Sequence, residues 1–165
     1  MILSKATGYG IRALIYLARH PKDELCGLEE IASSEQIPPV FLRKVLGELR
    51  RHRLLRSLKG IHGGYALARS AQSITLWEVI ESLGGSAEFD QCILGCGYCS
   101  SDDPCPLHQE WQVLRQQLLH SWQHKTISEI AAESQARPSV QSALGQHSAG
   151  TTDQAVPGER SRRCR

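Results

Sequence analysis

The first third of the chain has a helical period of apolar residues, which predicts three helices there. Residues 3–20 carry one apolar face and are followed by Pro21, which ends a helix. A short second helix is expected over 28–32. A third begins at Pro38 or Pro39, because the missing proline N–H costs nothing in the first turn of a helix. Its buried stripe has i, i+3, i+4, i+7 spacing and consists of Leu42, Val45, Leu46 and Leu49.

Two short apolar strands are expected after the third helix, over 54–58 and 64–67. They flank the glycine-rich segment 59–63, whose glycines allow positive φ and close approach to a phosphate backbone. Two short helices, a tight turn and a basic helix predict a helix-turn-helix, and a hairpin directly after it is typical of a winged helix. A basic helical hairpin with a purely structural β-turn is the alternative interpretation.

Charge divides the chain and supports the first interpretation. Residues 1–70 contain 12 Lys and Arg against 6 Asp and Glu, and 43–59 contain seven basic residues and one acid. Residues 71–134 contain 2 basic residues against 9 acidic ones. A basic half beside an acidic half indicates that the first half meets a polyanion such as DNA, whereas a solvated charge pattern without a partner is the plainer explanation.

The second half of the chain is expected to begin with a helix over 74–83. Residues 84–106 show no period and are rich in Gly, Ser, Asp and Cys, which indicates a loop. A long helix follows over 106–124, with an apolar stripe that is long for so small a chain. We expect dimerisation through this stripe, with packing on the first helix as the alternative, and it consists of Leu107, Trp111, Leu114, Leu118 and Trp122.

These elements predict a mainly α protein: a winged helix-turn-helix domain with a small β-hairpin wing, plus a long dimerisation helix. A short helix over 126–133 closes the ordered part. No apolar run approaches the roughly 20 residues that span a bilayer, and the charges near the start do not fit a signal peptide, so a cytoplasmic protein is expected. The expected parts are the DNA-binding domain 1–83, the cysteine-rich loop 84–106, the dimerisation and closing helices 107–134 and a disordered tail 135–165.

Four of the six cysteines lie within fourteen residues, and a histidine follows three residues later. Clustered thiols in a reducing compartment predict a metal or iron–sulfur site, formed here by Cys92, Cys96, Cys99, Cys105 and His108. Structural zinc usually takes two Cys-x-x-Cys pairs, and this chain has one, so the spacing favours a cluster. Zinc binding, thiol–disulfide sensing and loop cysteines without a metal are the alternatives.

The two remaining cysteines have no partner close in sequence. Cys26 is expected to be a small buried residue and Cys164 a residue of the tail.

Together these motifs resemble the Rrf2 family of winged-helix transcriptional regulators, of the iron–sulfur type that includes IscR, NsrR and RirA. The resemblance covers about residues 1–134 and is carried by 3–10, 59–65, 74–80 and 105–108. It implies a homodimer that reads a palindromic operator in double-stranded DNA and senses iron–sulfur status, iron, redox state or nitric oxide.

The resemblance also implies one [2Fe-2S] or [4Fe-4S] cluster per subunit. Family ligands fall on Cys92, Cys99 and Cys105, and the family histidine falls on His108. This chain departs from the pattern by having Cys96 as well, so Cys96 and His108 compete for the fourth position.

For DNA contacts, the first turns of the third helix are expected to face base edges with Val40, Arg43 and Lys44. Phosphate contacts are expected from its end and from the wing, and the candidates are Arg50, Arg51, Arg56, Lys59 and His62. The sequence shows no nucleotide loop, catalytic triad or paired carboxylates, so no enzyme is expected. An iron–sulfur redox protein without a DNA role is the remaining alternative.

Overall fold

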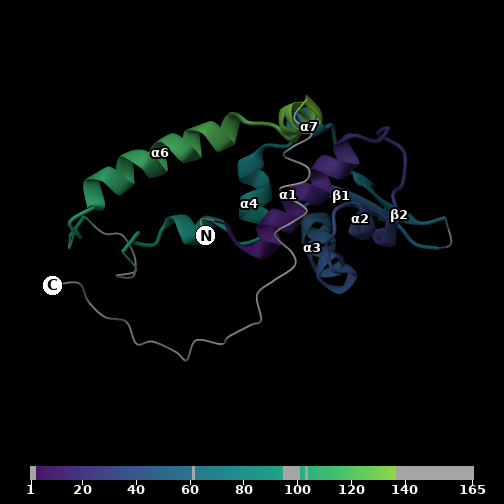
Figure 1. Cartoon of the computed structure of the whole chain (residues 1–165), viewed down its shortest axis with the longest axis horizontal. Helices are drawn as coiled ribbons and strands as arrows, with labels where there is room; N and C mark the ends of the chain where they lie inside the picture. The colour runs from purple at the N-terminus through teal and green to yellow at the C-terminus, as the bar shows by residue number, and fades with distance from the viewer. Residues whose placement is uncertain (1–2, 61, 95–100, 103, 137–165) are drawn as a thin grey trace.

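A computed structural model of the chain describes residues 3–60, 62–94, 101–102 and 104–136 (Figure 1). The expected disorder of 135–165 therefore falls, beyond Ala136, outside the described residues. The elements in chain order are α1 (Lys5–Ala18), α2 (Leu28–Ser34), α3 (Pro39–Arg51), β1 (Leu55–Leu58), β2 (Gly64–Leu67), the 3-10 turn η1 (Ala71–Ser73), α4 (Leu76–Ser82), α5 (Ser86–Phe89), α6 (His108–His124) and α7 (Ile127–Ala136).

The core lies between α1 and the helices packed around it. α1 contacts α3, α4 and α7, and β2 lies against it as well. Gly10 allows the close approach of α4, because a Cβ there would come within 2.4 Å of Leu83 Cδ1. The predicted stripe of α3 is confirmed, since all four of its residues are buried in this core: Leu42, Val45, Leu46 and Leu49.

The predicted hairpin is also confirmed, as an antiparallel pair in which Leu55 lies opposite Leu67. One further segment joins its outer side. The backbone of Cys26 exchanges two hydrogen bonds with that of Tyr65, at 3.0 and 2.9 Å. The residues before α2 therefore form an antiparallel bridge with β2. The wing is thereby attached to the helix-turn-helix by backbone bonds as well as by side chains.

α4 begins later than the expected position 74, because Thr75 is its N-cap. The Thr75 hydroxyl accepts from the Glu78 backbone N–H at 3.2 Å, and the Glu78 carboxylate accepts from the Thr75 N–H at 2.9 Å. This reciprocal pair satisfies two donors that have no partner within the helix.

The expectation of a structureless loop over 84–106 is wrong at its start, where α5 forms a short helix. Its last residue, Phe89, is one of the largest fully buried side chains among the described residues. Phe89 packs edge-on against Trp77 at a centroid distance of 5.7 Å and against Trp122 at 5.2 Å. This aromatic cluster comes from three separate elements, and it packs α5 against α4 and α6.

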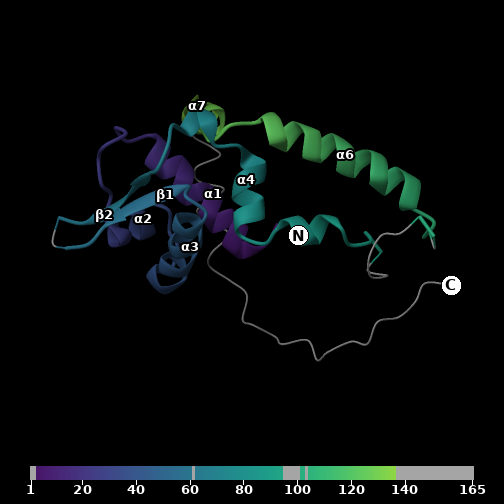
Figure 2. The ribbon, with the colours of Figure 1, turned by 180° about the vertical axis from the view of Figure 1, so that it is seen from behind.

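α6 extends away from the body as a long helix, and both views agree on this (Figures 1 and 2). Of its expected apolar stripe only Trp111 is buried, while Leu107 is 42% and Leu114 52% exposed. Val113, outside the predicted stripe, is 51% exposed. Leu118 and Trp122 are half-buried, so the described residues leave part of the apolar side of α6 uncovered, around Leu107, Val113 and Leu114. Among the described residues, no helix is both long and apolar enough to cross a bilayer.

Candidate functional site

The outward face of α3 carries the predicted DNA-reading residues. Val40 is 71% exposed, and Arg43 and Lys44 follow one turn later, also exposed. Sequence reasoning missed Phe41, which is 60% exposed beside Val40 although aromatic side chains are usually buried. The sequence pattern could have identified Phe41 as exposed, because Phe41 falls outside the buried stripe of α3. An exposed ring here can contact a thymine methyl group.

A groove of about 420 Å³ runs between α3 and the wing. Arg43 and Arg50 line it from the helix, and Lys59 lines it from the wing. Arg50 also lies 3.5 Å from the Ser57 hydroxyl of β1. The structure thus brings residues from two separate elements to one basic groove.

Two predicted phosphate contacts are paired with acids instead of standing free. Arg51 pairs with Glu48 one turn earlier on α3. Arg56 pairs with Asp23 at 3.1 Å and donates to the Lys22 carbonyl at 3.2 Å. Exposed ion pairs stabilise a fold weakly, so a DNA phosphate can replace either carboxylate.

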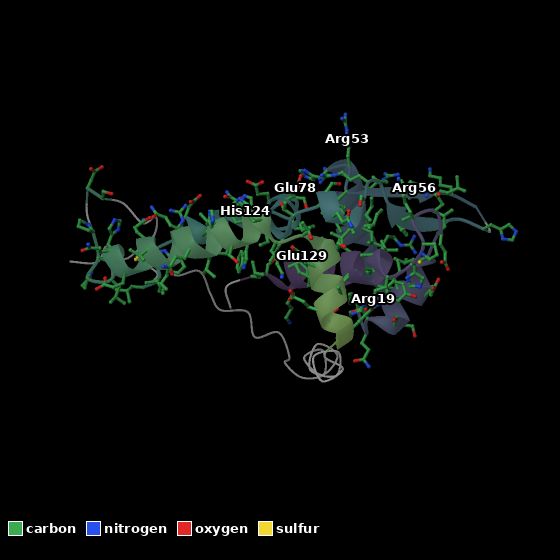
Figure 3. The ribbon with its side chains drawn as sticks, turned by 90° about the horizontal axis from the view of Figure 1, so that it is seen from above. Arg19, Arg53, Arg56, Glu78, His124 and Glu129 are labelled. Carbon is green, nitrogen blue, oxygen red and sulfur yellow. The ribbon has the colours of Figure 1, made fainter. Side chains whose placement is uncertain are left out.

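One further cation was missed by sequence reasoning. Arg53 is exposed in the turn between α3 and β1, where it adopts a φ of 59°, and it projects outward from the body (Figure 3). Its left-handed backbone is uncommon for a residue with a side chain.

Glycine is required in the wing for a close approach of the backbone. Gly60 has a φ of 115°, and its carbonyl accepts from the Gly63 N–H at 2.9 Å. A Cβ on Gly63 would lie 2.2 Å from the Leu58 carbonyl oxygen. His62 lies exposed within this turn. The turn needs glycine at two positions, and the His62 side chain can face solvent or DNA.

The structure brings together two of the predicted cluster ligands. The sulfurs of Cys92 and Cys105 are 3.4 Å apart, although the residues are 13 positions apart in sequence. Cys92 is buried and Cys105 half-buried. Cys96 and Cys99 lie outside the described residues.

The predicted fourth ligand, His108, is the first residue of α6 and is half-buried. Its backbone N–H donates to the Cys105 carbonyl at 2.9 Å, which places the two residues in one turn. Both line an open hollow of about 570 Å³ at the start of α6.

The segment before Cys92 runs antiparallel along α6, and each of its last three residues contacts the helix. Phe89 packs on Trp122, and Asp90 pairs with Arg115, about two turns nearer the start of α6. The Trp111 indole N–H then donates to the Gln91 carbonyl at 3.1 Å. The cysteine pair therefore lies at the end of α6 away from the body, and it is connected back to α4 through Phe89.

Cys26 is not part of this pair. It is 1% exposed beside β2, as the sequence predicted, and burial raises the pKa of its thiol to about 11, with a smaller contribution from Glu30. Cys164 lies outside the described residues.

Known proteins match both the sequence and the fold. The family model for Rrf2, described as an iron-dependent transcriptional regulator, matches residues 3–133. An HTH-type transcriptional regulator of Aquifex aeolicus is 37% identical, over 79% of this chain and 91% of that protein. The HTH-type transcriptional regulator IscR of Klebsiella pneumoniae is 28% identical, over 79% of this chain and 79% of that protein.

Among solved structures, CymR, the global cysteine regulator of B. subtilis, superposes with a TM-score of 0.67 at 23% identity. The match covers 79% of this chain and 96% of CymR, and it confirms the mainly helical, winged-helix fold. The family match argues against a redox protein without a DNA role. The chain belongs to the Rrf2 family, and it is a DNA-binding transcriptional regulator rather than an enzyme.

Proposed function

We propose that this regulator works in the cytoplasm as a homodimer on a palindromic operator and changes its affinity with the state of an iron–sulfur cluster in its cysteine loop. The observation that carries the proposal is the 3.4 Å approach of Cys92 and Cys105. Two thiolates on one tetrahedral metal ion lie about 3.8 Å apart when each metal–sulfur bond is about 2.3 Å. The two described thiols therefore lie close enough to bind one metal ion together, as two cysteines on the same iron of a cluster would.

Cys92, Cys99 and Cys105 are the proposed core ligands, with Cys96 or His108 as the fourth. When bound, the cluster supplies a redox- and iron-sensitive link between the two ends of the loop. Burial of Cys92 keeps water from its sulfur, and the hollow beside Cys105 and His108 leaves one side open to small molecules.

The loop can influence DNA binding because residues 86–92 are attached along α6. When Cys92 and Cys105 are joined, residues 86–92 are held against α6. Phe89 packs on Trp77, so a movement of this segment also moves α4. α4 in turn packs on α1 and α3. Opening of the loop loosens these contacts and changes how α6 is held on the domain that carries the recognition helix.

The uncovered side of α6 is the proposed dimer interface. Val113 and Leu114 expose apolar surface that a second α6 would remove from water. Pairing two copies sets the spacing of two recognition helices, which must match two half-sites about one helical turn of DNA apart. Phosphate contacts come in this proposal from Arg50, Arg51, Arg56, Lys59 and His62, and base contacts from Val40, Arg43 and Lys44.

The test is anaerobic purification with iron and acid-labile sulfide counts, followed by DNA binding of the cluster-bound and cluster-free protein to fragments selected from its own genome. We expect iron and sulfide in equal amounts, a visible absorption band and a changed operator affinity on cluster loss. Protein without iron or sulfide after anaerobic reconstitution would overturn the cluster assignment.

A second candidate is a thiol switch at the same place. Sulfurs 3.4 Å apart need to approach by a little over 1 Å to reach the roughly 2.05 Å of a disulfide bond. Oxidation by a peroxide would join Cys92 and Cys105, and the two thiols would lose two protons and two electrons to the peroxide. Reversible loss of two thiols without any iron, accompanied by a change in operator affinity, would favour this candidate.

A further inference from the structure

A second group of metal-ligand types lies in the DNA-binding part of the molecule, away from the cysteine loop in sequence. It comprises His20 just after α1, Cys26 before α2 and Glu30 within α2. One ligand atom from each of these side chains lies within 4.8 Å of the others. His20 and Cys26 lie in the connection between α1 and α2 and Glu30 lies within α2, so the turn of the chain between the two helices brings the three together.

We propose that His20, Cys26 and Glu30 bind a divalent cation of the zinc class. Imidazole, thiolate and carboxylate are the three donor types that zinc takes in proteins, usually in tetrahedral geometry. Three protein ligands leave the fourth position to water. The proposal does not rest on the cluster, because none of its ligands belongs to the cysteine loop.

The spacing fits a cation with a small adjustment. Donors on one tetrahedral zinc ion lie about 3.3–3.8 Å apart, given bonds of about 2.0–2.3 Å. The ligand atoms here are at most 4.8 Å apart, so they must approach by about 1 Å to bind one ion. The exposed Glu30 and half-buried His20 side chains can make this movement. Cys26 is almost fully buried and stays in place.

Contacts beyond the three donors already orient them. His20 Nδ1 lies 2.9 Å from the Tyr16 carbonyl, which can only accept, so this nitrogen donates and Nε2 is the nitrogen that would bind a cation. A histidine bonded in this way to a backbone carbonyl is the usual outer-shell arrangement of a metal ligand. The His20 ring also stacks on Tyr16 at 4.5 Å.

The Glu30 carboxylate is held from two sides. Oε1 accepts from the Tyr16 hydroxyl at 2.7 Å, and Oε2 accepts from the Gly27 N–H at 3.1 Å. Each oxygen accepts one bond here and keeps a lone pair for a cation. Tyr16 therefore contacts both outer ligands, which restricts their rotation before any metal arrives.

A cation here would connect the end of α1, the start of α2 and the wing. Cys26 is bonded through its backbone to Tyr65 of β2, and Gly64 lies so close that a Cβ on it would come within 2.6 Å of the Cys26 carbonyl oxygen. β2 in turn packs against α1. Binding would hold the wing against the helix-turn-helix and raise the thermal stability of this part.

The test uses the full chain with the four loop cysteines Cys92, Cys96, Cys99 and Cys105 changed to Ser, so that the loop cannot bind the probe. Co²⁺ is added under reducing conditions and read by its thiolate absorption, and Zn²⁺ affinity is measured by competition. We expect one equivalent of Co²⁺ per chain and a rise in Tm with Zn²⁺.

His20→Ala and Glu30→Gln should each weaken Zn²⁺ binding by about tenfold or more. Glu29→Gln, on the exposed neighbour of Glu30 in α2, should leave the affinity unchanged. Neither test residue is buried, so we expect both variants to fold. Circular dichroism checks that they do.

The proposal is wrong if the folded parent takes up no Co²⁺, or if His20→Ala and Glu30→Gln bind as tightly as Glu29→Gln. Because the loop cysteines are absent from every variant, a negative result would not bear on the proposed cluster. Likewise, finding no cluster in the unmodified chain would not bear on the proposed cation site.

Discussion

The indole N–H of Trp111 donates to the backbone carbonyl of Gln91 at 3.1 Å, and Gln91 directly precedes Cys92. This bond joins the first turns of α6 to the residue next to Cys92, whose sulfur faces Cys105. A buried donor of this kind costs free energy when its acceptor moves away, so the bond resists separation of the loop from the helix.

Replacement of Trp111 by Phe should therefore keep the apolar contact and remove the bond to Gln91. We expect the free energy of unfolding to fall by about 0.5–1.5 kcal/mol and iron to leave the protein faster. Chemical denaturation and the rate of iron transfer to a chelator measure the two effects. Gln116→Ala, at an exposed position of α6, is the control and should change neither. Unchanged iron release in Trp111→Phe would mean that this contact does not support the loop.

Ligand identity is tested by single substitutions in the loop. Cys92→Ser, Cys99→Ser or Cys105→Ser should abolish the visible absorption, because each removes a thiolate from the proposed core set. Cys96→Ala and His108→Ala should differ, since only the variant that lacks the true fourth ligand loses or shifts its bands. Anaerobic spectra after reconstitution distinguish the two. Full cluster content in Cys96→Ala, His108→Ala and Cys105→Ala alike would contradict the assignment of this loop.

The base-reading role of α3 predicts a change in sequence preference. Arg43→Ala should weaken operator binding by about 1–3 kcal/mol and relax preference at one position in each half-site. Lys59→Ala, across the same groove, should weaken all DNA sequences alike and reduce the salt dependence of binding. Binding to operator and random DNA over a salt series compares the two. An equal loss on both DNAs for Arg43→Ala would contradict its contact with a base.

The uncovered side of α6 predicts the oligomeric state. Leu114→Glu combined with Leu118→Glu should place charge in an apolar interface and produce monomers that no longer hold a palindrome. Sedimentation velocity gives the mass. Gln117→Glu, at an exposed position of the same helix, adds a charge and should stay dimeric. A Leu114 and Leu118 double variant that remains dimeric would place the interface elsewhere.

The Glu78 cap of α4 predicts a dependence of stability on pH. Burial raises the pKa of Glu78, but its hydrogen bond from Thr75 and its pairing with Arg69 outweigh this and hold the pKa below its usual range. A carboxylate with a lowered folded pKa stabilises the fold above its unfolded pKa of about 4.3, and this contribution disappears as the pH falls through the folded pKa.

Glu78→Gln keeps a capping side chain and removes the charge. It should cost about 0.5 kcal/mol at pH 7, a small value because the carboxylate is 40% exposed, and the difference from wild type should vanish at acid pH. Figure 3 shows Glu78 near the junction of α6 with the body. Glu81→Gln, exposed on the same helix, is the control in thermal melts at both pH values. A constant difference between wild type and Glu78→Gln across pH would show that charge is not the cause.

The sequence by itself determined the recognition helix and the wing, because a local period reports which side of an element is buried. Leu42, Val45, Leu46 and Leu49 identified the inner face of α3, and their spacing left Arg43 and Lys44 on the outer face. The spacing of the cysteines indicated a metal or cluster loop for a related reason, since its donors are neighbours in sequence.

Only the tertiary structure decided which distant residues meet. No period marks Phe89, whose burial comes from Trp77 on one side and Trp122 on the other. Arg56 meets Asp23 across 33 positions, which no local pattern indicates. Such contacts depend on how the whole chain folds. Folding is driven by the burial of apolar surface from many elements together, so these contacts cannot be predicted from any single segment of the sequence.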